Sequence, residues 1–112
     1  MSHYDLTKLR AMAQGNEAFV QRMISVFLEH TPEQVKQITE YFQDHNLSKV
    51  SALAHKIKPS IDLMGIDELK TVIREIELKA KDNNEENLSM LIARLNSIIG
   101  SVFKDISKEL AA

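Results

Sequence analysis

Apolar side chains recur at helical spacing along almost the whole chain, in one short segment and four long ones. The short segment carries Leu6, Leu9 and Met12 and predicts a leading helix over about residues 5–14. The long segments predict helices over about residues 17–44, 47–64, 67–82 and 85–110. Because the connectors between them are short and polar, the pattern predicts an all-α protein, an up-down-up-down four-helix bundle with a short N-terminal covering helix.

The first long segment has a wider apolar face than one bundle interface requires. One stripe runs from Val20 to Phe42, and a second stripe, formed by Phe19, Met23 and Val26, lies beside it. We expect the leading helix to cover the second stripe, because its own apolar residues would otherwise have nothing to pack against.

Capping residues and a proline mark the expected helix ends. Asn16, Asn46 and Asp67 stand directly before apolar periodic runs, where each can act as an N-cap. Pro32 lies inside the first long segment and predicts a kink or a brief break there, because proline lacks a backbone N–H and crowds the preceding turn.

Composition narrows the class of protein further. The chain has 112 residues, which is the size of one domain over residues 1–112, and its formal net charge of -2 offers no basic surface for nucleic acid. The first ten residues, MSHYDLTKLR, lack the pattern of a signal peptide, and the late apolar stretch is interrupted by Arg94 and Asn96, so no membrane segment is expected. The absence of cysteine excludes a disulfide framework, and we expect a cytoplasmic protein.

The residue spacings also exclude several kinds of chemistry. None of the histidines belongs to a Glu-x-x-His or His-Glu-x-x-His pattern, so no metal site is expected. Gly15, Gly65 and Gly100 lie far apart and form no phosphate-binding loop, which argues against a chain that binds ATP and acts as a kinase by itself.

His55 differs from the other three histidines. We interpret His3, His30 and His45 as ordinary residues of a frayed terminus or of helix ends. At about 100° per residue, His55 lies about 140° from Val50, which marks the apolar side of the same helix, so the imidazole should point away from the core. From geometry alone, a solvated surface histidine is the simplest interpretation.

The segment from Ala54 to Gly65 resembles the signature of histidine-containing phosphotransfer (HPt) domains. In that signature a histidine is followed by a lysine three residues later, a small residue beyond the lysine, and a glycine ten residues after the histidine. The matching residues here are His55, Lys58, Ser60 and Gly65. The resemblance covers most of the chain. It implies that Nε2 of His55 accepts a phosphoryl group from a receiver-domain aspartate and passes it to another in a multistep two-component phosphorelay. Lys58 would then offset the phosphoryl charge.

The resemblance also implies partners and a docking surface. Expected partners are the receiver domains of hybrid histidine kinases and of response regulators, which would supply Mg2+, while this chain would be a monomeric phosphocarrier without a cofactor and not an enzyme. Lys49, Lys56 and Lys58 make the helix of His55 locally basic, which favours a carboxylate-rich receiver. Met23 or Phe27 could also lie near this surface, although core packing is the simpler interpretation. The expected docking residues are Ser48, Ser51, Ala52, Lys56, Pro59 and Asp62.

Pro59 departs from the family pattern, which usually has glycine four residues after the histidine. Its missing N–H would have bonded the carbonyl of His55, so a bend is expected there. This departure keeps a second function open, a helical adaptor that binds receivers or other helices without being phosphorylated. A third possibility, a dimeric helical scaffold, predicts a continuous exposed apolar stripe.

Overall fold

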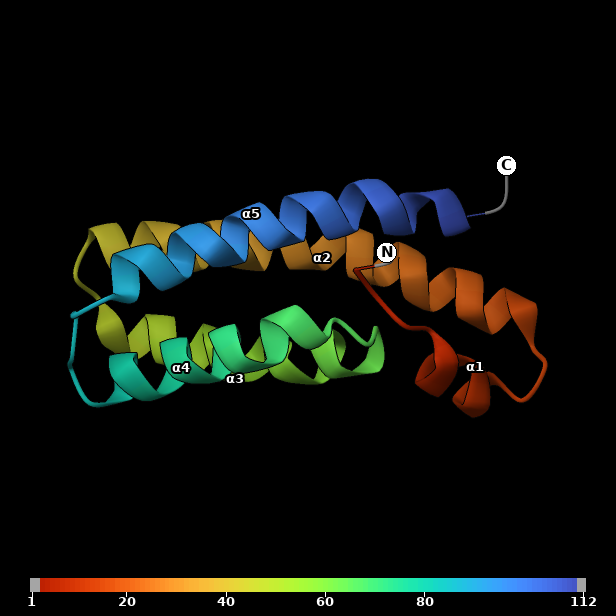
Figure 1. Cartoon of the computed structure of the whole chain (residues 1–112), viewed down its shortest axis with the longest axis horizontal. Coiled ribbons are helices and arrows are strands. Elements are labelled where there is room, and N and C mark those ends of the chain that lie inside the picture. The colour runs from red at the N-terminus through yellow and green to blue at the C-terminus, as the bar shows by residue number, and fades with distance from the viewer. Residues whose placement is uncertain (1–2, 111–112) are drawn as a thin grey trace.

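The computed structural model describes residues 3–110, and these residues form five α-helices and a final 3-10 turn without a β-strand (Figure 1). The helices are α1 (Thr7–Ala13), α2 (Glu17–Gln43), α3 (Leu47–Leu63), α4 (Asp67–Lys81) and α5 (Leu88–Ile106), followed by η1 (Ser107–Glu109). The all-α prediction is confirmed. The first two and last two residues of the predicted domain lie outside the described part of the chain.

The four long helices form an elongated bundle with principal extents of 44 × 23 × 22 Å. In Figure 1, α2 and α5 form the upper layer, α3 and α4 form the lower layer, and α1 lies below the N-terminal part of α2. Each long helix packs against its two neighbours around the bundle, and α3 and α4 make the most extensive contact. The predicted four-helix bundle with its short N-terminal helix is therefore confirmed.

The apolar stripes meet in one core along the bundle axis. Among the fully buried side chains are Ile24, Ile38, Ile57, Ile73 and Leu95, which come from all four long helices. Burial of such side chains contributes about 1.5–3 kcal/mol each before the entropy of ordering is subtracted. This packing determines which face of each helix stays exposed and can contact other molecules.

The leading helix covers less of α2 than its pattern suggested. Leu9 and Ala13 are buried one turn apart, whereas Met12 is 57% exposed, so the expected burial of Met12 is wrong. A helix of seven residues buries only one narrow face, and in α1 Ala13 takes the inward position. Val26 of the second α2 stripe also stays 39% exposed.

Two of the three predicted caps are confirmed. The side chains of Asn16 and Asn46 each accept a hydrogen bond from the backbone N–H three residues further on, at the start of α2 and α3. Asp67 is not a cap, because Ile66 occupies the N-cap position of α4 without a side-chain hydrogen bond. Asp67 instead lies in the first turn, where its negative charge is favourable near the N-terminal end of the helix dipole.

Helix α2 passes through Pro32 without a break, so of the two expected outcomes, a kink or a brief break, the break is wrong. Proline removes a single backbone donor, while Phe27, Thr31 and Val35 on both sides of it are buried in the core. Packing against the neighbouring helices therefore holds the two halves of α2 together. Helix α3 likewise remains one helix through Pro59.

The last helix is shorter than the apolar pattern suggested. It begins at Leu88, because Asn87 has a left-handed backbone with φ of 65° and Asn84 Oδ1 accepts the N–H of Glu86 in a local turn. It ends at Ile106, where the chain tightens into η1. None of the helices within residues 3–110 has the length and apolar character that crossing a bilayer requires.

Gly65 forms the turn between α3 and α4 and supports the N-terminal segment. Its φ is +62°, and a Cβ atom built there would lie 2.2 Å from the carbonyl oxygen of Asp5. The N–H of Asp5 donates to the carbonyl of Met64 at 3.1 Å. The glycine of the sequence motif is thus explained by backbone geometry and close approach.

Candidate functional site

His55 lies in the middle of α3 and its side chain is 72% exposed. Ala54 directly before it and Ile57 two residues after it are completely buried in the core. The prediction that the imidazole points away from the core is confirmed. The ring therefore stands on the outer surface of a helix whose other face is fixed by packing.

Glu77 of α4 joins His55 to Lys58. One carboxylate oxygen, Oε2, lies 2.8 Å from Nδ1 of His55, and the other, Oε1, accepts a hydrogen bond from Nζ of Lys58 at 2.8 Å. The carboxylate is only 17% exposed. A single anchored group thus holds both residues that the sequence motif singled out.

The charge state of Glu77 determines the tautomer of His55. The hydrogen bond from Lys58, with a smaller contribution from His55, lowers the pKa of the Glu77 carboxyl although burial acts in the opposite direction. An ionised carboxylate can only accept hydrogen bonds, so Nδ1 of His55 must carry the proton. In the neutral ring, Nε2 then holds the free lone pair. No described residue forms a hydrogen bond with Nε2.

The antiparallel packing of α3 on α4 brings Glu77 to this position. Ser51 Oγ donates to the backbone carbonyl of Glu77 at 3.3 Å, and Lys70 Nζ lies 3.4 Å from the carboxylate of Asp62 at the other end of the pair. Glu77 follows the buried Ile76 and therefore stands at the edge of the interface. Sequence reasoning missed it, because 22 residues separate it from His55 and the helical pattern does not give the register between two helices.

The expected docking residues occupy the outer face and edges of α3. Ser48, Ala52, Lys56 and Pro59 are exposed, whereas Ser51 and Asp62 are partly buried. Asp62 is held by ion pairs with Lys8 and Lys70, so its carboxylate is not a free contact group. The docking role of these residues remains a prediction.

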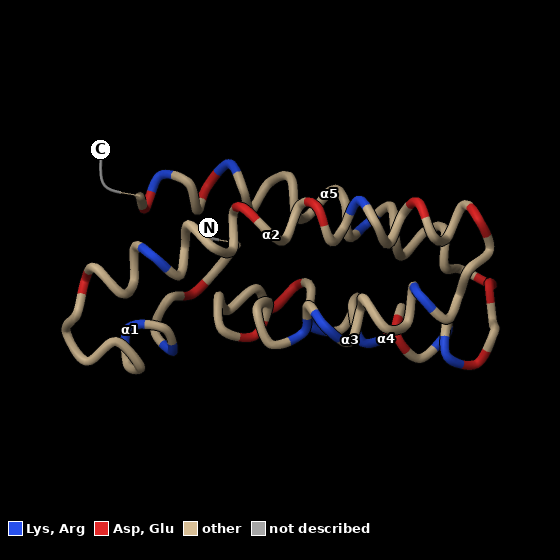
Figure 2. Tube along the Cα trace, turned by 180° about the vertical axis from the view of Figure 1, so that it is seen from behind, with Lys and Arg blue, Asp and Glu red and all other residues tan. Residues whose placement is uncertain are grey.

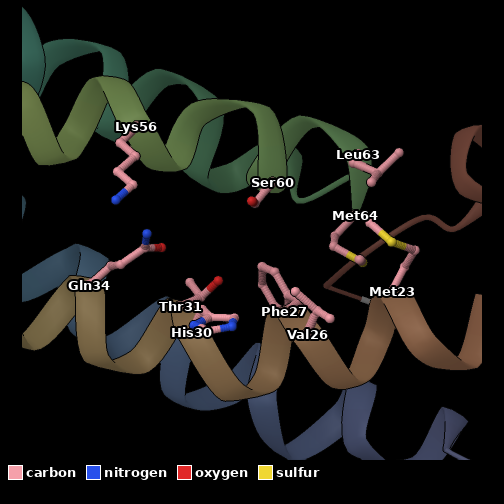
Figure 3. Close-up of a pocket in the computed structure, with 10 residues that line it drawn as sticks. All are labelled: Met23, Val26, Phe27, His30, Thr31, Gln34, Lys56, Ser60, Leu63 and Met64. Atoms are coloured by element: carbon pink, nitrogen blue, oxygen red, sulfur yellow. The ribbon is translucent and has the colours of Figure 1, made fainter.

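A groove between α2 and α3 adjoins this face (Figure 3). Its volume is about 270 Å3, and Figure 3 shows Met23 pointing from α2 toward Leu63 and Met64 at its apolar end. The polar end contains Gln34 and Lys56, which point toward one another from the two helices. The remaining lining residues are Val26, Phe27, His30, Thr31 and Ser60. The groove thus combines an apolar floor with a partly basic rim.

Charge is distributed unevenly between the two layers. Helix α3 carries three lysines and one aspartate, whereas α2 carries two basic residues and four glutamates. Figure 2 shows many of the lysine and arginine positions along the layer formed by α3 and α4. Helix α3, which carries His55, is therefore locally basic although the whole chain has a net charge of -2.

His45 offers a useful contrast with His55. It is 76% exposed, and its Nδ1 lies 2.9 Å from Oε1 of Glu85, so an exposed histidine with a carboxylate partner is not unique to the His55 site. No described lysine shares Glu85, and His45 stands in a turn with φ of 58°. The combination of a helical surface, a carboxylate and a lysine distinguishes His55.

The other two histidines have different surroundings. His3 is not frayed, because its Nδ1 lies 3.0 Å from Glu68 and its Nε2 lies 3.7 Å from Asp105. His30 is exposed and lines the α2–α3 groove. Within residues 3–110, no three histidine or acidic side chains come together as metal ligands.

Comparison with known proteins places these features in a family. The family model described as "Hpt domain" matches residues 22–105, which include α3, α4 and the whole His55 site. The chain belongs to the Hpt domain family. This Hpt domain is 23% identical over 84 residues to the phosphorelay intermediate protein YPD1 of Candida albicans, a match over 75% of this chain and 46% of that protein. The chain thus spans about half the length of this curated relative.

The fold of this Hpt domain also matches a solved structure. The crystal structure of histidine-containing phosphotransfer protein B (HptB) from Pseudomonas aeruginosa PAO1 superposes with a TM-score of 0.87. The match covers 96% of this chain and 94% of the other at 18% sequence identity. The comparison shows a shared helical fold along almost the entire length.

Proposed function

We propose that this Hpt domain carries a phosphoryl group on Nε2 of His55 between receiver-domain aspartates in a multistep two-component phosphorelay. The observation that supports this function is the contact of the Glu77 carboxylate with both His55 and Lys58. It anchors Nδ1 of the exposed ring and directs the lone pair of Nε2 outward, with Lys58 one helical turn away.

In the proposed reaction, Nε2 attacks the phosphorus of a receiver phospho-aspartate. The N–P bond forms as the bond from phosphorus to the aspartate oxygen breaks, and the aspartate leaves as a carboxylate. The ring gains positive charge but keeps its Nδ1 proton, which Glu77 stabilises through its negative charge. Attack by an aspartate of a second receiver reverses these bond changes and restores the neutral ring.

Lys58 has a second role in this proposal. Its ammonium group starts on Glu77, and because a lysine side chain is flexible, it can turn toward the phosphoryl oxygens as negative charge arrives. Catalysis would then depend on alignment and charge neutralisation, as in other phosphoryl transfers. The Mg2+ expected in the reaction would belong to the receiver, and the chain itself would be a carrier and not a kinase.

The docking face would include the outer surface of α3 and the adjoining groove. Exposed Ala52 and Pro59 leave space beside His55, and Lys56 belongs both to this outer surface and to the lining of the groove. We further propose that the domain acts as a monomer. The exposed large apolar residues of the described chain, Met12, Val26, Leu78 and Met90, lie on four different helices, so no single helix carries the continuous stripe that a helical scaffold would need.

Transfer from a phosphorylated receiver in the presence of Mg2+ tests this function. The wild-type chain should acquire an acid-labile, alkali-stable label that His55→Gln lacks. His45→Gln is the matched control, because His45 is equally exposed and also has a carboxylate partner, and it should retain the label.

A second candidate function, an adaptor that is not phosphorylated, is motivated by Pro59. The adaptor would be supported if no receiver encoded in the source genome labels the chain while at least one still binds it. A label that persists in His55→Gln would refute the assignment of His55.

A further inference from the structure

A second hollow lies on the opposite side of α3 from the groove, between α3 and α4. Its volume is about 450 Å3, and Pro59 and Ile73 form part of its apolar wall. Its rim carries three cations and one carboxylate: Lys58, Lys70, Arg74 and Asp62. We call this hollow the α3–α4 cleft. Lys58 connects it directly with the His55 site.

Most charges around the α3–α4 cleft are already neutralised. Lys58 pairs with Glu77 at 2.8 Å, and Lys70 pairs with Asp67 at 3.0 Å and Asp62 at 3.4 Å. Arg74 is exposed and has no ion pair with any residue of the described chain. It therefore contributes an uncompensated positive charge at the rim of the cleft.

The position of Arg74 follows from the register of the two helices. Lys70, Arg74 and Glu77 are spaced four and three residues apart and share one face of α4. Three residues of α-helix rise about 4.5 Å, so the backbone of Arg74 lies less than one turn from that of Glu77, which anchors His55. A partner that covers His55 would also reach this guanidinium.

We propose that the α3–α4 cleft binds a carboxylate-bearing segment next to the phosphorylated aspartate of the receiver, with Arg74 as its main contact. This inference rests on the proposed function. A receiver that holds Mg2+ beside an aspartate must present several carboxylates, because oxygen ligands of this kind bind Mg2+. Arginine is suited to such a partner, since its planar fork donates two hydrogen bonds to one carboxylate.

The two hollows then define how the partner is oriented. The α2–α3 groove offers apolar surface on one side of the ridge that carries His55, and the α3–α4 cleft offers positive charge on the other. A receiver that engages both must straddle α3 with its active site above Nε2. In this arrangement Arg74 determines orientation and rate of encounter and does not touch the transferred group.

Charge reversal at Arg74 tests the inference. Arg74→Glu is compared with Arg94→Glu, a matched substitution at an exposed arginine of α5, which lies in the other layer. Each variant is titrated with the receivers of the source genome, activated with Mg2+ and beryllium fluoride, at low and high salt. Circular dichroism verifies that both variants remain folded.

We expect Arg74→Glu to weaken receiver binding by about tenfold or more at low salt and by less at high salt, because salt screens exposed charges. Arg94→Glu should remain within about twofold of the wild type. The inference is overturned if both variants bind equally well, or if no receiver binds the wild-type chain. Saturable binding of inorganic phosphate that Arg74→Glu abolishes, with unchanged receiver affinity, would assign the cleft to a small anion and also overturn it.

Phosphoryl transfer is measured separately on the same samples. If a receiver binds the wild type and not Arg74→Glu, yet never labels His55, the cleft inference stands and the proposed phosphotransfer fails. If His55 is labelled at equal rates in Arg74→Glu and Arg94→Glu, with equal affinities, the proposed function stands and the cleft inference fails.

Discussion

Replacement of Gly65 by alanine perturbs the turn that joins the helix of His55 to the helix of Glu77. Gly65 has φ of +62°, and the new Cβ atom would meet the carbonyl oxygen of Asp5 at 2.2 Å. Because that contact involves backbone and not the end of a flexible side chain, the N-terminal segment must move. The other two glycines are matched controls, since a Cβ atom at Gly15 or Gly100 meets no atom within 4 Å.

Two effects destabilise the Gly65→Ala variant. A left-handed backbone costs an alanine about 1–2 kcal/mol, which applies to Gly65 and to Gly15 with its φ of +87°. Displacing Asp5 from Gly65 also breaks its hydrogen bond to Met64, worth about 1 kcal/mol, so Gly65→Ala should lose about 3 kcal/mol in total. Gly100 is helical, and alanine there should add up to about 1 kcal/mol.

Thermal unfolding followed by circular dichroism measures all three variants. For a domain of this size, about 3 kcal/mol corresponds to a fall of about 10–15 °C in Tm, against about 4–8 °C for Gly15→Ala and a small rise for Gly100→Ala. Phosphotransfer measured well below Tm should be unchanged, since Gly65 does not contact His55. A fall for Gly65→Ala no larger than that for Gly15→Ala would refute the argument from close approach.

Three further predictions concern the His55 site. Glu77→Ala should slow phosphoryl transfer by about tenfold, because the His55 ring loses its anchor and the stabilisation of its charge. Glu77→Gln keeps an acceptor for Nδ1, and its transfer rate should stay within about threefold of the wild type. Equal rates for wild type and Glu77→Ala in a rapid-quench assay would contradict this positioning role. Because the pKa of Glu77 is lowered in the folded chain, its contribution to stability is complete above its ordinary value of 4.5 and is lost as pH falls through the lower folded value. Urea unfolding at a series of pH values should therefore show a steeper acid loss in wild type than in Glu77→Gln, and parallel curves would count against the shift. Pro59→Ala restores an N–H for the carbonyl of His55 and should raise the free energy of unfolding by about 1–3 kcal/mol. An unchanged or lower free energy of unfolding in the same urea assay would show that α3 already accommodates the proline.

Periodicity predicted most of the fold because helical hydrogen bonds and amphipathic faces are local properties. The four long helices, the caps at Asn16 and Asn46 and the outward direction of His55 all follow from residues within a few turns of one another. The two failures have different causes, one in tertiary packing and one in a local turn. Core packing carried α2 through Pro32, and the backbone of Asn87 delayed the start of α5.

The common helical face of His55 and Lys58 follows from the sequence alone, because their spacing of three residues places them about one turn apart. The contact of Glu77 with both residues, and the cleft that Arg74 shares with Lys58, become visible only in the packed bundle. The sequence pattern does not give these contacts, because the axial register of α3 against α4 depends on how their side chains interlock over the whole interface. No local pattern encodes that register.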